Sequence, residues 1–411
     1  MPSDWAHPAP FCGTARSACS RSTSLARERA CWRRPSETPM PSLLPGVGIP
    51  WPLSTSMGCA KGCPISQLAA VLFSSLSKAK PFRPWRCWQR LRRMVSDSFD
   101  PASLRAGLAP LRLAAPPEPV GAEQRAYLSH YGLWLVDDFP GLTAHMGVVA
   151  AGGERVAAHC WQVAQPRGSV VVIHGYFDHV GLYRHLIRHL IGERFSVFAF
   201  DLPGHGLTTG QEASVESFDE YVAALDACLE EAFAHLPAPY HLMGQSTGGA
   251  VAMEWFLAHG HTRATSPFAN TVLLAPLVRP YQWIFNRWVY RAVRPFINER
   301  PRTFANNSDD PEFLRFLRDD DPLQSRVLPV AWVTAMVRWK RRFLRYPPTD
   351  IAPLVIQGQQ DKTVDWRYNM RVISRLFAAR IVYLPTARHH LVNETEEIRK
   401  TIFEAIIEEL A

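Results

Sequence analysis

The stretch Leu242-Met243-Gly244-Gln245-Ser246-Thr247-Gly248-Gly249 decides the fold of this chain. An apolar run ends in a Gly-x-Ser-x-Gly pentapeptide, and apolar residues resume directly behind it. That order predicts a strand, an abrupt turn and a helix. So tight a turn strains the backbone at its apex and requires small residues two positions before and after it, which Gly244 and Gly248 supply. Ser246 at the apex is then a candidate nucleophile at the carboxyl edge of a sheet.

The pentapeptide by itself also fits an ordinary strand-to-helix turn in which the serine is the N-cap of the helix. The two interpretations differ in what surrounds the serine. A nucleophile needs a base, an acid that orients the base, and backbone donors for an oxyanion.

Strands alternate with helical patterns on both sides of the pentapeptide. Residues 169–173 form a continuous β-branched run, the pattern of a buried central strand. A capping box at Ser217-Phe218-Asp219-Glu220 opens a helix, and a hairpin is expected over 144–161. Further strands are expected at 195–200, 271–275, 354–356 and 381–384, and further helices at 182–191 and 393–410. This alternation predicts an α/β fold, a mostly parallel sheet flanked by helices.

One insertion interrupts the alternation. Between Pro276 and Pro353 no strand is evident, while helical stretches rich in Trp and Phe are. We interpret residues 277–350 as a helical lid over the site, with residues 94–276 and 351–411 as the two parts of the core. Ordinary packing of core aromatic residues is the alternative.

Residues 1–93 differ in composition from the rest. They hold 14 of the 45 Lys and Arg residues but 3 of the 37 Asp and Glu residues, and six of the eight cysteines. No sustained helical or strand period is visible there. We expect an unstructured extension, or upstream sequence translated from a start codon set too early, with Met94 as the natural first residue. Because the positive charge belongs to this segment, nucleic-acid binding by the folded part is not expected. Cys160 and Cys228 are interpreted as small buried hydrophobic residues.

Candidates for the acid and the base follow the serine in the chain. Asp361 comes directly after the expected strand 354–356, and His389 follows the expected strand 381–384. Both therefore lie at carboxyl ends of parallel strands, where such sites assemble. His390 competes with His389 for the role of base, and Asp365 competes with Asp361 for the role of acid. The order serine, aspartate, histidine is that of one serine-hydrolase architecture.

The oxyanion hole requires two N–H donors aimed at one point. One is expected from Thr247, directly after the nucleophile. The other is expected from Tyr176, in the loop His174-Gly175-Tyr176-Phe177-Asp178-His179 that follows strand 169–173. His174 is interpreted as a structural residue that bonds loop backbone.

From about Ala144 to Ala411 the chain resembles the α/β-hydrolase superfamily, in its monoacylglycerol lipase and lysophospholipase-like (serine aminopeptidase-type) branch. The motifs that carry the resemblance are His174-Gly175 with Asp178-His179 and Tyr183, Asp201-Leu202-Pro203-Gly204-His205-Gly206, the Ser246 elbow, Gly358-x-x-Asp361, and His389-x-Leu391-x-Asn393-Glu394. In that last pattern the first histidine is catalytic, which selects His389 over His390. The segment from Asp310 through Asp321-Pro322-Leu323 to Trp332 also resembles the branch.

The resemblance implies a serine hydrolase that acts on lipid-derived esters, with Ser246, Asp361 and His389 as its triad and with no metal or organic cofactor. Tyr176-Phe177 replaces the small residues usual after His-Gly, so these two side chains are expected to narrow or cover the acyl pocket. The basic residues Arg338, Lys340, Arg341, Arg342 and Arg345 beside lid aromatics are interpreted first as a solvated helix face, with contact to an anionic membrane surface as the alternative. A cytoplasmic location is expected. An aminopeptidase, a small-ester hydrolase and a non-catalytic binding module on the same scaffold are the competing functions.

Overall fold

The core of the protein is a sheet of eight strands in the order β1-β2-β4-β3-β5-β6-β9-β10. The six strands β4, β3, β5, β6, β9 and β10 run parallel to one another, while β2 is antiparallel to both β1 and β4. The computed structural model describes residues 99–114 and 120–411, so the predictions for residues 1–93 lie outside the described residues. The strands are β1 (Thr143–Ala151), β2 (Glu154–Gln162), β3 (Gly168–Ile173), β4 (Phe195–Phe200), β5 (Tyr240–Gln245), β6 (Phe268–Leu274), β9 (Leu354–Gly358) and β10 (Arg380–Leu384).

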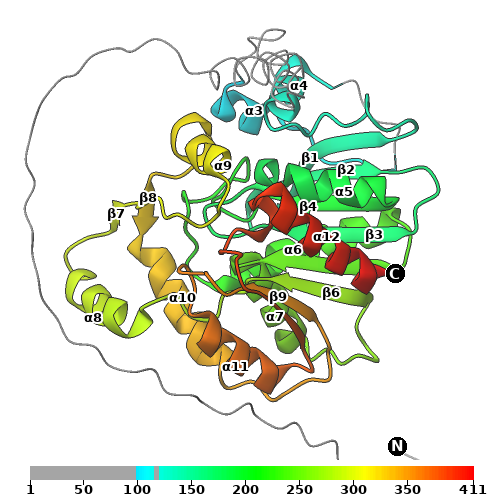
Figure 1. Cartoon of the computed structure of the whole chain (residues 1–411). Coiled ribbons are helices and arrows are strands. Elements are labelled where there is room, and N and C mark those ends of the chain that lie inside the picture. The colour runs from blue at the N-terminus through cyan, green and yellow to red at the C-terminus, as the bar shows by residue number, and fades with distance from the viewer. Residues whose placement is uncertain (1–98, 115–119) are drawn as a thin grey trace, which may run out of the picture. The chain divides into compact units, whose positions relative to one another are not determined.

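Helices cover both faces of this sheet (Figure 1). A cluster of buried hydrophobic residues lies on each face of the sheet. Alternate side chains of β3 point to opposite faces, so Val171 and Ile173 belong to one cluster and Val170 and Val172 to the other. One cluster takes in side chains of α6 (Phe218–His235), α7 (Thr247–Ala258) and α11 (Trp366–Leu376). The other takes in side chains of α3 (Pro101–Gly107), α4 (Ala122–His130), α5 (Arg184–Gly192) and α12 (Glu396–Leu410). The predicted three-layer fold is therefore confirmed.

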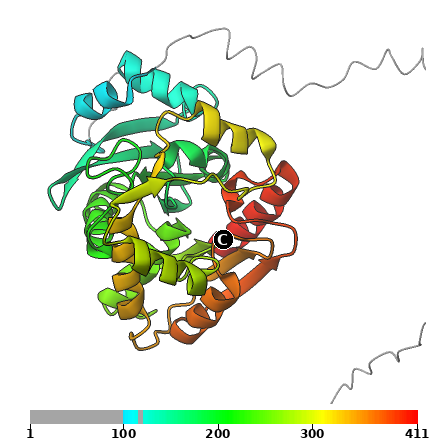
Figure 2. The same ribbon diagram turned by 90° about the vertical axis from the view of Figure 1, so that its left-hand side faces the viewer.

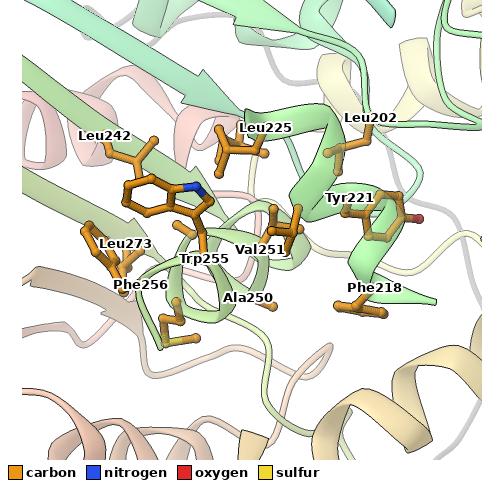
Figure 3. Packing of buried hydrophobic residues seen from close by; sticks show 14 of the residues in the cluster. Leu202, Phe218, Tyr221, Leu225, Leu242, Ala250, Val251, Trp255, Phe256 and Leu273 are labelled. Atoms are coloured by element: carbon orange, nitrogen blue, oxygen red, sulfur yellow. The ribbon is translucent and has the colours of Figure 1, made fainter. Parts of the chain in front are cut away.

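The central helix α7 is buried from Thr247 to Leu257 and is mostly apolar, as expected of a helix enclosed by other elements. Figure 3 shows its Val251 and Trp255 among Leu225 of α6 and Leu242 of β5. The predicted capping box is present at the start of α6, where Ser217 is the N-cap and the Glu220 side chain accepts the Ser217 N–H. The helix begins where the sequence predicts it to begin.

The segment between β6 and β9 contains α8 (Trp283–Val293), the short helix α9 (Pro311–Arg315) with the π-helical turn Phe316–Asp320, and α10 (Val330–Phe343). Figure 2 turns this segment toward the viewer. It also contains a two-stranded antiparallel ribbon of β7 (Glu299–Pro301) and β8 (Val327–Pro329), so the expectation that no strand lies here is wrong. Strands of three residues that each contain a proline are too short to show an alternating pattern.

Two shorter helical turns complete the fold, Val180–Tyr183 after β3 and Leu391–Asn393 after β10. Cys160 and Cys228 are both free and buried, as the sequence predicts. No helix among the described residues combines the length and the apolar character needed to cross a bilayer.

Candidate active site

Ser246 occupies a strained turn between β5 and α7. Its φ of 51° and ψ of −110° lie outside the regions that residues with a side chain normally adopt. A Cβ added at Gly244 would lie 2.5 Å from the Gly248 carbonyl oxygen, and one added at Gly248 would lie 2.2 Å from the Ile173 carbonyl oxygen. Only glycine leaves room at either position, because any side chain would meet the backbone. At Gly248 the close neighbour is the backbone of strand β3.

The sheet order brings the other site residues to this turn. β3 and β5 are neighbours with Ile173 opposite Gly244, so the loop after β3 lies beside the Ser246 turn. β9 and β10 are also neighbours, with Gly358 opposite Leu384, which places Asp361 and His389 on adjoining loops. All four loops follow the carboxyl ends of parallel strands, the edge where sites of α/β sheets form.

Ser246, His389 and Asp361 form a continuous chain of hydrogen bonds. The His389 Nε2 lies 3.0 Å from the Ser246 Oγ, and its Nδ1 lies 2.7 Å from the Asp361 Oδ2. The Asp361 carboxylate also accepts the N–H groups of Thr363 and Val364 and the side-chain amide of Gln357. The Ser246 side chain stands in the position of a nucleophile whose proton an imidazole accepts.

The electrostatics of the pair favour a charged imidazole. Burial alone would lower the pKa of His389, but the Asp361 carboxylate outweighs burial and raises that pKa above its ordinary value. Burial would likewise raise the pKa of Asp361, but His389 and the two backbone N–H donors outweigh it and lower that pKa. Asp361 thus stays ionised and stabilises the imidazolium that proton transfer from Ser246 would create.

The two competing residues have other partners. His390 Nε2 lies 3.2 Å from Asp178 Oδ2, and its ring packs edge-on against Phe313. Asp365 is the N-cap of α11 and pairs with Arg279. Neither residue bonds with Ser246 or His389, so the geometry favours the residues selected from the sequence.

The loop after β3 presents Tyr176 next to the Ser246 turn. The Asp178 N–H donates to the Gly175 carbonyl and closes the loop, while Phe177 has a φ of 66°. A Cβ added at Gly175 would lie 3.4 Å from the Cβ of Ser246, so the loop backbone passes directly beside the serine. Thr247 begins α7, where the first N–H groups have no partner within the helix. Thr247 thus directly follows the serine in the chain, and Tyr176 directly follows Gly175, the residue that approaches the serine.

His174 supports the loop, as predicted. Its Nδ1 lies 2.7 Å from the Gly175 carbonyl oxygen and its Nε2 accepts the Leu202 N–H at 2.8 Å. Burial lowers the pKa of His174 to about 3, so the ring is neutral and joins the loop to the Asp201–Gly206 segment.

Several supporting residues were not predicted from the sequence. The Asn307 carbonyl accepts the backbone N–H groups of both His389 and His390, at 3.0 and 2.7 Å. Glu394 accepts the N–H groups of Arg388 and Asp309 and so ties the His389 loop to the inserted segment. The Glu394 signal was available in the His-x-Leu-x-Asn-Glu motif. The Asn307 contact uses a carbonyl that any residue type carries, so no sequence pattern marks it.

The inserted segment covers the loop after β3. The Trp332 ring of α10 stacks on Tyr176 with centroids 3.6 Å apart, and Arg302 lies over the Phe177 ring at 4.1 Å. Ser246 is only 7% exposed. The two large side chains that replace small residues after His-Gly thus contact the inserted segment directly.

Comparisons with known proteins show the family of the chain. The profile of a family described as "Serine aminopeptidase, S33" matches residues 164–396. A phospholipase of Bacillus subtilis is 26% identical over 50% of this chain and 80% of its own length, and a monoacylglycerol lipase of Mycolicibacterium smegmatis is 26% identical over 60% and 90%. The crystal structure of a soluble variant of monoglyceride lipase from Saccharomyces cerevisiae with a substrate analog covers 65% of this chain and 96% of that chain, at a TM-score of 0.55 and 17% identity.

Proposed function

Because the chain belongs to the serine aminopeptidase (S33) family and is a carboxylic ester hydrolase with the α/β-hydrolase fold, we propose that its substrates are lysophospholipids or monoacylglycerols, cleaved through an acyl-enzyme on Ser246. The single observation that carries the catalytic part is the hydrogen-bond chain from Ser246 through His389 to Asp361. The relatives named for phospholipid and monoacylglycerol cleavage support the substrate class.

In the proposed reaction the Ser246 Oγ attacks the ester carbonyl while His389 Nε2 takes its proton. Asp361 holds the imidazole with Nδ1 as the donor and stabilises its positive charge. The Tyr176 and Thr247 N–H groups bind the oxygen that becomes negative in the tetrahedral intermediate. His389 then gives its proton to the leaving alcohol. In the second half of the reaction water attacks the acyl carbon while His389 takes a proton from it. His389 returns that proton to the Ser246 Oγ as the carboxylic acid is released.

The direct test is labelling of the full chain with a fluorophosphonate, read by intact mass, beside hydrolysis of a panel of esters. We expect one adduct on the wild-type protein and none on Ser246→Ala, with hydrolysis reduced roughly 10⁴- to 10⁶-fold in the variant. A folded wild-type protein that takes no label would overturn the proposal and leave a binding module in its place.

The panel also separates the competing activities. It contains lysophosphatidylcholine, monooleoylglycerol, a short-chain p-nitrophenyl ester and an aminoacyl amide. Turnover of the two lipids well above that of the short ester supports the proposed substrate class. Preference for the aminoacyl amide would make the protein an aminopeptidase, and preference for the short ester would make it a small-ester hydrolase.

A second part of the proposal concerns the membrane surface that holds such lipids. Seven of the eight large hydrophobic residues that are exposed in the described chain lie within residues 281–297, on and around α8. Ile284 and Phe285 are 68% exposed, Trp288 is 59% exposed and Phe296 is 84% exposed. Arg287 and Arg291 lie over the Trp288 ring at 5.4 Å. Apolar side chains flanked by arginines are suited to rest in the headgroup region of an anionic bilayer.

We propose that α8 contacts the membrane, and that the basic residues of α10 do not. Arg342 of α10 pairs with Asp219 and Glu254, and Lys340 lies over the Trp283 ring at 5.1 Å, so both are engaged within the protein. Sedimentation with vesicles of phosphatidylcholine and phosphatidylserine tests the surface. We expect the double variant Phe285→Ser and Trp288→Ser to bind at least several-fold more weakly, while Tyr383→Ser, which removes an aromatic exposed to 43% on β10, binds as the wild type does. Equal binding by all three proteins would contradict α8 contact.

A further inference from the structure

Asp178 is a second carboxylate at the site, and the triad does not use it. It lies in the loop after β3, is 7% exposed, and packs directly behind Gly175. A Cβ added at Gly175 would lie 2.7 Å from the Asp178 Oδ2 and 3.4 Å from the Cβ of Ser246. Gly175 is thus enclosed by the carboxylate on one side and the serine on the other.

A chain of polar contacts joins Asp178 to the backbone of this loop. The Gly175 N–H donates to the Tyr183 hydroxyl oxygen at 3.0 Å, and that hydroxyl donates to Asp178 Oδ2 at 3.1 Å. On its other side Asp178 Oδ2 lies 3.2 Å from His390 Nε2, close enough for an ion pair although not aligned as a hydrogen bond. Tyr183 and His390 are both buried. The Gly175 amide, one residue before the Tyr176 N–H, is therefore held by a buried network.

On the basis of the proposed function, we propose that Asp178 is a positioning residue for the oxyanion donor of Tyr176 and adds its charge to that of Asp361 at His389. The Tyr183 hydroxyl transmits the first effect, because it joins the Asp178 carboxylate to the Gly175 N–H by two hydrogen bonds. A donor shifted by a few tenths of an ångström stabilises the tetrahedral intermediate less, since such donors act at fixed distances.

The second effect is electrostatic, because Gly175 alone separates the Asp178 carboxylate from Ser246, whose Oγ lies 3.0 Å from His389 Nε2. Burial is the largest influence on the pKa of His389 and lowers it, Asp361 raises it most, and the charge of Asp178 raises it further. The titratable and charged groups that face Asp178 from the surrounding elements are His174, His179, Tyr183, His205, Arg302, His389 and His390.

These facing groups leave Asp178 ionised. Burial lowers the pKa values of His174 to about 3 and His205 to about 4, so these rings are neutral near pH 7. The His179 ring pairs with Asp321 at 3.0 Å. Burial would raise the pKa of Asp178, but His390 outweighs it and the pKa is lowered. The carboxylate is thus negative over the pH range in which His389 titrates.

The test compares two conservative substitutions that each remove one hydroxyl. Tyr183→Phe breaks the link between Asp178 and Gly175. The matched control is Tyr131→Phe, because Tyr131 is equally buried and donates to the buried Asp321 at 2.7 Å but has no bond with Gly175. We expect kcat on a lipid ester to fall about tenfold in Tyr183→Phe with KM within about twofold, and Tyr131→Phe to retain wild-type values within about twofold.

The electrostatic effect has its own readout. In Asp178→Asn the pKa of His389 is expected to fall, because a negative charge near the imidazolium is lost, and the acid limb of the kcat/KM profile then moves to lower pH. Tyr183→Phe keeps the charge and is expected to leave the limb in place. If Asp178 had a purely structural role, Asp178→Asn would lower stability and kcat but would leave the acid limb at the wild-type pH.

Two results would overturn the inference, namely equal kcat in the two tyrosine variants, or an acid limb of Asp178→Asn at the wild-type pH. If Asp178→Asn does not fold, as judged by its melting temperature and fluorophosphonate labelling, the tyrosine pair decides alone. A wild-type protein without esterase activity would instead sink the proposed function, so the two failures are distinguishable.

Discussion

The Nε2 of His389 lies 3.0 Å from the Oγ of Ser246, although 143 residues separate the two in the chain. The contact exists because the serine directly follows β5 and the histidine follows β10, and both strands end at the same edge of the sheet. The first prediction concerns the third member of this group. Asp361→Asn should lower kcat by roughly 10⁴-fold, because the asparagine amide cannot hold the same imidazole tautomer.

The matched control for that measurement is Asp365→Asn, four residues later. Asparagine can also cap α11 but cannot form the ion pair of Asp365 with Arg279, so this substitution should cost up to about 1 kcal/mol of unfolding free energy and leave kcat within a few-fold. Steady-state kinetics and thermal melts of both variants check this. A larger loss of kcat in Asp365→Asn than in Asp361→Asn would show that Asp365, and not Asp361, is the acid of the triad.

The pH dependence follows from the raised pKa of His389. The base must be neutral to accept the Ser246 proton, so kcat/KM should rise with pH through that pKa, above the ordinary value for histidine. Removing the Asp361 charge lowers the pKa of His389, so the residual activity of Asp361→Asn should persist to lower pH. The pH profile of kcat/KM gives the acid limb of the wild type and of Asp361→Asn. Acid limbs at the same pH would contradict the pairing of Asp361 with His389.

The close approach of α7 to β3 at the Ser246 turn predicts that one added methyl group lowers the free energy of unfolding strongly. Gly248→Ala would place its Cβ 2.2 Å from the Ile173 carbonyl oxygen, so strand and helix must separate. We expect a loss of about 3 kcal/mol or more in unfolding free energy, or a protein that does not fold. Gly107→Ala meets nothing within 4 Å at the end of α3 and should be neutral or stabilising by up to about 1 kcal/mol. Chemical denaturation compares them, and a well-folded Gly248→Ala would refute the close approach.

The stack of Trp332 on Tyr176 predicts control of access to Ser246. Trp332→Ala should raise the rate of labelling by a bulky, long-chain fluorophosphonate relative to a small one, because it uncovers the loop. Trp339→Ala removes another buried tryptophan of α10, which stacks on Phe218 and donates to Glu254, away from Tyr176. Both variants should lose about 3–5 kcal/mol of stability, but only the first should change the ratio of labelling rates. An unchanged ratio in Trp332→Ala would exclude this residue as a cover.

Buried Glu254 anchors α10 to α7 and gives a stability prediction. It is fully buried, accepts from Trp339 and Tyr346, both at 2.9 Å, and pairs with Arg342 at 2.7 Å. Glu254→Ala leaves the Arg342 charge and two donors without this partner and should cost about 3–5 kcal/mol. Asp219→Ala removes the exposed partner of the same arginine and should cost less than about 1 kcal/mol. Thermal denaturation of the two variants checks the difference, and similar losses would argue against the anchor.

The core and the proposed triad could be predicted from the sequence because their signals are local. A strand buried on both sides appears as an unbroken apolar run, and a turn that admits only glycine carries a glycine on each side of its apex. The ribbon of β7 and β8 was missed because three residues are too few to show a period. The basic residues near α10 suggested membrane contact as one of two interpretations of the sequence, although tertiary contacts engage Lys340 and Arg342. The role of Asp178 was not predicted because it depends on Tyr183 and His390, which only the fold brings together.

The Asn307 carbonyl, which accepts two N–H groups of the loop after β10, has a consequence for protein engineering. The inserted segment is not an interchangeable module, since part of the support for His389 belongs to it. A chimaera that exchanges this segment for that of a relative, in order to change substrate preference, must also supply a backbone acceptor at the same place. Without one, the graft would disturb the base along with the specificity it was meant to alter.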